Sequence, residues 1–156
     1  YKRQTWGVKD EFLDNGMGEY IDDTHISFYE SVNKSRLTII TYHPNVTGYE
    51  TLSANLPTLL FWNNDQLKLR ANVQKFYDDL EDVGVYHKTL ESLIQQIEIV
   101  NSDIDKWWYS SKVQLAVKKY CSKFAHTNNN CVDDWVKELS KYPKLLPLQS
   151  LLYHLC

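Results

Sequence analysis

The chain has 156 residues, of which 43% are hydrophobic and 24% are charged. This length and composition are typical of one globular domain with a sizeable core, and they exclude a largely disordered protein. The formal net charge of −3 argues against a nucleic-acid-binding surface. No apolar run is long enough to span a membrane. Three cysteines without metal-site spacing predict reduced thiols in a cytoplasmic protein: Cys121, Cys131 and Cys156.

The N-terminal part of the chain begins without a clear periodic pattern. Residues 1–20 mix glycines with charged residues, so we expect irregular structure there, followed by a short strand at residues 19–21. A helix is expected to end near Asn33. Either Asp23 or Thr24 is suited to cap its first turn.

A strand–helix–strand unit forms the centre of the prediction. Residues 37–41 and 58–62 are short β-branched or apolar runs, which are typical of strands covered on both faces. The intervening segment 47–55 has apolar side chains at helical spacing, and Pro57 ends it. Two strands joined by a helix make a parallel crossover, which places the turn at residues 43–48 on the carboxyl edge of the sheet.

The second half of the chain is predicted to be mostly helical. Its expected elements are helices near 73–80, 89–100, 111–125 and 131–139, a short strand at 85–86, and an aromatic-rich turn at 103–109. Strand and helix therefore alternate first, and helices follow. This order predicts an α/β fold with a Rossmann-like parallel sheet, flanking helices and a helical C-terminal end. We expect residues 1–142 to form this domain and residues 143–156 to form an apolar tail.

The turn at residues 43–48 is the candidate binding site, because a helix N-terminus at this edge of a sheet attracts anions, phosphates above all. Gly48 allows a ligand to approach the backbone, and Thr47 offers a hydroxyl. Thr47 and Glu50 also fit a capping box, so an ordinary helix start is the alternative. His43 suits phosphate binding or acid–base chemistry near neutral pH, and equally an ordinary turn.

Two other groups of residues have structural explanations. Asp22, Asp23 and His25 have metal-binding side chains, but helix capping explains both acids without an ion. Trp107 and Trp108 are predicted to pack in the core rather than to stack on a sugar.

Several segments resemble the C-terminal part of one family of bacterial surface-carbohydrate transferases. The resemblance rests on Thr41-Tyr42, Thr47-Gly48-Tyr49-Glu50-Thr51-Leu52, Asn55-Leu56-Pro57-Thr58 and Phe61-Trp62-Asn63. It continues through Phe76-Tyr77-Asp78-Asp79-Leu80, Val83-Gly84-Val85-Tyr86-His87, Trp107-Trp108 and Val113-Gln114, and covers roughly Trp6 to Phe124. The chain departs from the family pattern at His43-Pro44, where small polar residues are more usual. These transferases are glycosyltransferases of the two-Rossmann-domain type, called GT-B, and are linked to O-antigen and lipopolysaccharide assembly.

The resemblance implies the donor-binding part of a glycosyltransferase, with a nucleotide-sugar donor and a bacterial surface glycan as acceptor. In GT-B enzymes the acceptor is held by an N-terminal Rossmann domain, which this sequence lacks, so we expect a fragment of a longer enzyme. Glu50 would bind the ribose hydroxyls of the donor. The implied donor-binding residues are Arg3, His43, Asn45, Thr47, Gly48 and Glu50. For Arg3, a solvated terminus is the alternative.

The resemblance also implies no metal, no further cofactor and no nucleic-acid partner. It implies a cytoplasmic location, or one at the inner face of the membrane. The alternative function is a non-catalytic α/β interaction domain whose apolar tail, residues 143–156, mediates assembly.

Overall fold

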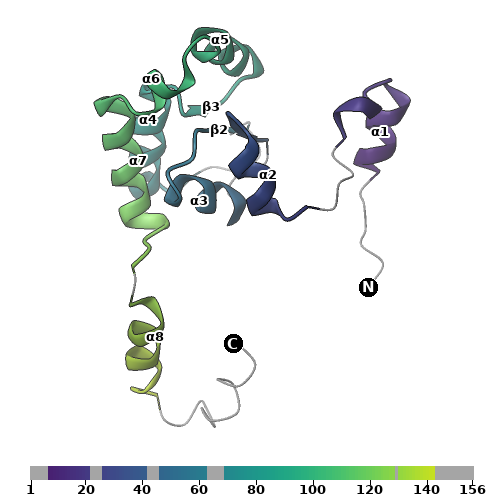
Figure 1. Ribbon diagram of the computed structural model, residues 1–156. Coiled ribbons are helices and arrows are strands. Elements are labelled where there is room, and N and C mark those ends of the chain that lie inside the picture. The colour runs from purple at the N-terminus through teal and green to yellow at the C-terminus, as the bar shows by residue number, and fades with distance from the viewer. Residues whose placement is uncertain (1–6, 22–25, 42–45, 63–68, 129, 143–156) are drawn as a thin grey trace.

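The computed structural model describes residues 7–21, 26–41, 46–62, 69–128 and 130–142 (Figure 1). The predicted fold class is confirmed, because a three-stranded parallel sheet is flanked by helices and the C-terminal end is helical. The strands are β1 (Thr38–Ile40), β2 (Thr58–Phe61) and β3 (Tyr86–His87). The helices are α1 (Val8–Asp14), the 3-10 turn η1 (Gly18–Tyr20), α2 (Phe28–Lys34), α3 (Val46–Ser53), α4 (Ala71–Asp82), α5 (Leu90–Val100), α6 (Ile104–Trp108), α7 (Ser111–Phe124) and α8 (Cys131–Leu139).

The sheet has the strand order β1-β2-β3, and both pairs of neighbours are parallel. Thr38 lies opposite Thr58, and Leu60 lies opposite Tyr86. The central strand is buried on both faces, since the side chains of Leu59 and Leu60 point in opposite directions and both are fully buried. The predicted parallel crossover from residues 37–41 to residues 58–62 is therefore confirmed.

Helices cover the two faces of the sheet unequally. Figure 1 shows β2 and β3 between α5 on one side and α3 on the other. Helices α4 and α3 both contact α7, so these three helices form one layer, whereas α5 contacts β2 and β3 from the opposite face. The main core lies between the sheet and the layer of α3, α4 and α7, and its largest buried side chains are those of Trp108, Tyr86 and Tyr120.

Aromatic rings fill much of this core. Trp62 meets Tyr86 with ring centroids 4.7 Å apart and Tyr77 at 5.0 Å. Tyr77 also joins its hydroxyl to that of Tyr120 over 2.8 Å. The high tyrosine content of the chain is thus partly explained, because these side chains fill space while their hydroxyls find partners.

Three predictions for local structure were wrong. Residues 19–21 do not form a strand, because the N–H of Ile21 bonds to the carbonyl oxygen of Gly18 and closes the 3-10 turn η1. Residues 1–20 are not wholly irregular, since they contain α1. The aromatic-rich segment 103–109 forms α6 rather than a turn, because the Asp103 side chain accepts the N–H of Lys106 and caps a helix.

The start of α2 also differs from the prediction. Ser27 is its N-cap: the Ser27 hydroxyl accepts the N–H of Glu30, and the Glu30 carboxylate accepts the N–H of Ser27. This reciprocal pair is a capping box. The predicted caps, Asp23 and Thr24, lie outside the described residues.

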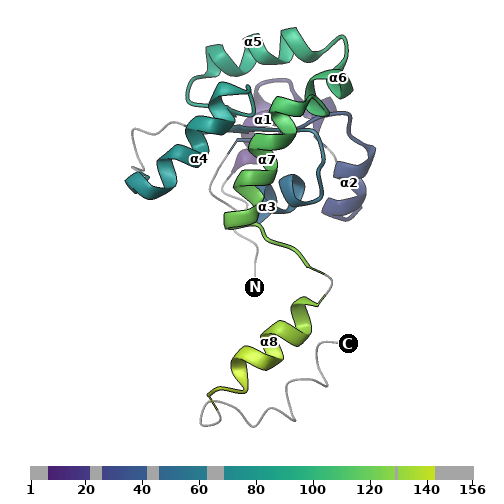
Figure 2. The same cartoon turned by 90° about the vertical axis from the view of Figure 1, so that its left-hand side faces the viewer.

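Two helices stand apart from the body of the fold. Figure 1 shows α1 beyond α2, and both Figure 1 and Figure 2 show α8 beyond the C-terminal end of α7. The predicted tail at residues 143–156 lies outside the described residues, so the boundary after residue 142 stays a prediction.

Candidate functional site

The candidate site lies where β1 gives way to α3. All three strands run in the same direction, so their carboxyl ends meet at one edge of the sheet, and α3 starts from this edge. The helix begins at Val46, and Thr47 and Gly48 complete its first turn. A helix N-terminus carries a partial positive charge, so this end of α3 favours an anion.

Glu50 has a defined partner in the structure. Its Oε1 accepts a hydrogen bond from the hydroxyl of Tyr29 over 3.0 Å, which links α3 to the first turn of α2. The Glu50 side chain is half-buried, whereas Tyr29 is 60% exposed. The hydrogen bond to the carboxylate and its negative charge raise the pKa of Tyr29, so the phenol stays protonated and remains a donor at neutral pH.

The predicted capping box between Thr47 and Glu50 does not match this geometry. Because α3 begins at Val46, Thr47 is the second residue of the helix and not its N-cap. The carboxylate of Glu50 bonds to Tyr29 instead. The geometry therefore differs from the predicted capping box, and the bond to Tyr29 is the structural alternative to ligand binding by Glu50.

Half of the predicted donor-binding residues can be placed. Thr47, Gly48 and Glu50 lie together in the first two turns of α3, where Gly48 is buried and its carbonyl oxygen accepts the Thr51 hydroxyl over 3.2 Å. The other predicted residues lie outside the described residues: Arg3, His43 and Asn45.

Sequence reasoning missed the aromatic pair beside Glu50. Tyr29 lies in edge-on contact with Phe28, with ring centroids 5.8 Å apart, and both side chains are exposed. Two adjacent aromatic residues at an exposed helix start were the available signal. Only the fold brings Tyr29 to a carboxylate 21 positions away.

His87 occupies the carboxyl end of β3, but its ring is engaged in the fold. Its Nδ1 lies 3.1 Å from the Ser92 hydroxyl and its Nε2 lies 3.1 Å from the carbonyl oxygen of Gly84. Burial lowers the pKa of His87, so the ring is neutral at neutral pH. Both ring nitrogens have protein partners, and His87 therefore acts as a structural tie between β3 and α5.

The paired tryptophans are packing residues, as predicted. Trp108 is fully buried. Trp107 is half-buried and donates its indole N–H to the carbonyl oxygen of Val83 over 3.1 Å. Trp108 has no exposed face for stacking on a sugar, and Trp107 packs against the main core.

The structure also bears on metal, thiol and membrane chemistry. In the part of the chain that the structure describes, no three acidic, histidine or cysteine side chains gather as a metal site would require. Asp22, Asp23 and His25 lie outside it. Cys121 and Cys131 are free thiols, and burial raises the pKa of Cys121 to about 11. Every described helix is too short or too polar to cross a lipid bilayer.

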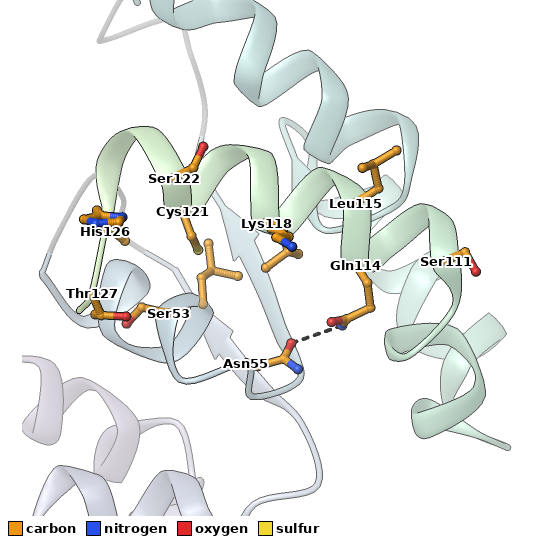
Figure 3. Close-up of a pocket in the computed structure, with 13 residues that line it drawn as sticks. Ser53, Asn55, Ser111, Gln114, Leu115, Lys118, Cys121, Ser122, His126 and Thr127 are labelled. Atoms are coloured by element: carbon orange, nitrogen blue, oxygen red, sulfur yellow. Dashed lines mark hydrogen bonds between the residues drawn. The ribbon is translucent and has the colours of Figure 1, made fainter. Parts of the chain in front are cut away.

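A separate groove of about 710 Å³ lies between α3 and α7 (Figure 3). It is formed by the C-terminal half of α3, including Leu52 and Ser53, and by one side of α7 from Ser111 to Ala125. This groove is distinct from the carboxyl-edge site, because Glu50 and Tyr29 are not among the residues that line it.

One comparison with known proteins gives a match. The sequence profile described as LIC12162 family transferase matches residues 1–139, so the matched stretch ends at the last residue of α8. No curated protein and no solved structure shows significant similarity to the chain.

Proposed function

The chain belongs to the LIC12162 family of transferases, and on this basis we propose that it forms the donor-binding part of a glycosyltransferase. The fold would be that of a partial GT-B C-terminal domain. The enzyme would transfer a sugar from a nucleotide-activated donor to a bacterial surface glycan, such as O-antigen or lipopolysaccharide.

The observation that supports this proposal most is the position of the Glu50 carboxylate. It lies one turn inside α3, close to the positive end of a helix that starts at the carboxyl edge of a parallel sheet. A carboxylate can accept two hydroxyl groups at once, as the ribose of a nucleotide would offer. The helix N-terminus would then attract the donor phosphates.

Tyr29 prepares Glu50 for this role. The bond from its hydroxyl orients one carboxylate oxygen of Glu50. Each carboxylate oxygen can accept two hydrogen bonds, so the ribose hydroxyls could still bind. A pre-positioned side chain loses less conformational entropy when the ligand binds. Thr47 would contact the donor phosphates, as would His43, Asn45 and Arg3. Gly48, which is buried, would allow close approach because it has no side chain.

Catalysis would rest on positioning the donor and on stabilising the departing nucleotide phosphate. We propose that the acceptor glycan is bound by a further Rossmann domain, that the reaction needs no metal, and that no nucleic acid is involved. The enzyme would act in the cytoplasm or at the inner face of the membrane, where nucleotide sugars and lipid-linked glycans meet.

A thermal-shift screen tests donor binding. The chain is heated with CMP, UDP, GDP, ADP and dTDP, and with the corresponding sugar nucleotides. Saturation at a hundredfold excess over Kd stabilises the folded state by about 2.7 kcal/mol, which corresponds to a rise in Tm of about 5–10 °C. We expect one base to give this shift.

Three variants assign the shift to the site. Glu50→Gln should abolish it, because the amide keeps the shape but loses the charge. Tyr29→Phe should weaken binding several-fold, and so reduce the shift by about a third, because the carboxylate is no longer held. Glu98→Gln, at an exposed position on α5, is the matched control and should keep it. A shift that survives Glu50→Gln, or no shift with any nucleotide, would contradict the proposal.

The alternative function is that of a non-catalytic interaction domain, predicted to assemble through its tail at residues 143–156. One observation favours such assembly, but it concerns α8 and not the tail. The helix α8 exposes large apolar side chains, among them Trp135.

A further inference from the structure

Helix α8 carries an apolar stripe that no described part of the chain covers. Val132, Trp135 and Val136 are 64%, 65% and 43% exposed. Together with Leu139 they follow the spacing i, i+3, i+4, i+7, which places them on one side of the helix. Figure 1 and Figure 2 both show α8 standing clear of the body. A continuous exposed apolar stripe of this kind marks an interaction surface.

The groove between α3 and α7 matches the stripe in size and character. Its lining is mostly apolar and includes Leu52, Leu115, Val117 and Cys121, several of which are drawn in Figure 3. The α7 wall from Gln114 to Ala125 is about 16 Å long, and α8 is about 13 Å long. A helix as short as α8 can therefore lie along the groove.

The charges of the two helices are also complementary. Helix α7 contains lysines and no acidic residue: Lys112, Lys118, Lys119 and Lys123. Helix α8 contains more acidic than basic residues, Asp133, Asp134 and Glu138 against Lys137, of which Glu138 pairs with Lys141. Lys118 itself lines the groove. The positive charge of Lys118 at the groove and the acidic side chains of α8 favour this pairing, and the like charges of two α8 helices disfavour α8 against α8.

Helix α8 lies away from the α3–α7 groove of its own chain (Figure 1, Figure 2). Asn128 accepts the N–H of Asn130 over 2.8 Å and donates to the carboxylate of Asp134, also over 2.8 Å. These bonds fix the first turn of α8 on the connecting segment. Figure 2 shows the helix leaving the end of α7 and running away from the body. In this arrangement α8 does not reach the groove of its own chain.

We propose that two copies of this chain exchange α8, so that each helix lies in the α3–α7 groove of the other copy. The exchange is symmetric, so both stripes and both grooves are covered in a closed dimer. It does not depend on the proposed donor site, which lies at the other end of α3.

Light scattering after size-exclusion chromatography tests the dimer. The full chain, measured over a wide concentration range, should reach twice the chain mass of 18.4 kDa. Trp135→Glu should weaken association at least about tenfold, because it places a charge in the middle of the apolar contact. Ile99→Glu, at a residue 71% exposed on α5, is the matched control and should leave the dimer intact.

Val132→Glu serves as a second variant, and circular dichroism verifies that both α8 variants keep their helices. A monomer at every concentration would overturn the proposal. So would a dimer that both α8 variants leave intact, because assembly would then use another surface.

Cross-linking distinguishes two arrangements: α8 in the groove of the other copy, and α8 in the groove of its own chain. Native cysteines are replaced by alanine, and then one chain receives Leu115→Cys and another Val136→Cys. A short bismaleimide should link the two chains in the mixed sample much more than in either sample alone. When both cysteines are placed on one chain, a cross-link within a monomer would show that α8 covers its own groove, and would overturn the exchange.

Discussion

The indole N–H of Trp108 donates to the carbonyl oxygen of Asn55 over 3.0 Å, and so ties α6 to the end of α3. Gln114 reinforces this contact by donating to Oδ1 of Asn55 over 3.1 Å and to the carbonyl oxygen of Trp108 over 2.9 Å. Three separate segments that resemble the transferase family therefore meet at one junction of α3, α6 and α7. This junction gives those motif residues a structural role, away from the carboxyl edge.

Replacing the buried tryptophan should destabilise the fold. We expect Trp108→Phe to lower the free energy of unfolding by about 2–3 kcal/mol, because it leaves a cavity and removes the donor to Asn55. Trp107→Phe is the matched control: this side chain is only half-buried, so its loss should cost about 1 kcal/mol. Urea denaturation followed by circular dichroism measures both. If both variants lost the same free energy of unfolding, the junction at Asn55 would not contribute specifically to stability.

A second prediction concerns the backbone conformation of Asn55. Its φ is 55°, in the left-handed region that glycine and asparagine tolerate and alanine does not. Asn55→Ala and Asn55→Gly both lose the contact with Gln114, so the difference between them isolates the backbone effect. We expect the alanine variant to be less stable by about 1 kcal/mol. An alanine variant as stable as the glycine variant would show that the left-handed turn has little energetic weight.

Helices and strands whose apolar residues form a clear pattern could be predicted from the sequence. Helices α5 and α7 have enough turns to repeat their apolar side, and the apolar runs at β1 and β2 are bounded by a turn and a proline. The parallel pairing follows because a helix joins these strands. By contrast, α6 has five residues, too few for a period, and its cap at Asp103 became recognisable only in the structure.

Relationships between distant residues could not be predicted. Glu50 was implied by family resemblance, but its partner Tyr29 lies on another helix, and only the packing of α2 beside α3 brings the two together. The Asn55 junction joins residues more than 50 positions apart for the same reason. Side-chain partners across such separations depend on the tertiary fold, which local patterns do not specify.

The buried histidine should make stability depend on pH. An unfolded histidine titrates near pH 6.5, and burial lowers the pKa of His87 in the folded protein. Below about pH 6.5 the unfolded chain therefore binds a proton that the folded chain resists, and the free energy of unfolding falls as the pH falls. Above about pH 6.5 both states are neutral, and this contribution becomes constant.

Urea denaturation at several pH values measures the effect. We expect His87→Gln to flatten the loss of stability below about pH 6.5, whatever its effect on stability at neutral pH. His126→Gln, which changes an exposed histidine, is the matched control. The same slope in His87→Gln and in the unchanged chain would exclude His87 as its source.

The joined hydroxyls of Tyr77 and Tyr120 should be energetically coupled. They lie 2.8 Å apart between α4 and α7, and burial is the largest cause of the raised pKa of both phenols. We expect each single change to phenylalanine to cost about 1–2 kcal/mol, because the hydroxyl that remains loses a partner in a buried site. The double variant should lose less stability than the sum of the two single variants, by at least about 0.5 kcal/mol, because both ends of the bond are then removed together.

Tyr109→Phe, at an exposed position, is the control. It should cost almost no stability, and its effect should add to that of Tyr77→Phe. Simple addition in the Tyr77 and Tyr120 pair as well would mean that the hydrogen bond between these helices contributes no measurable stability.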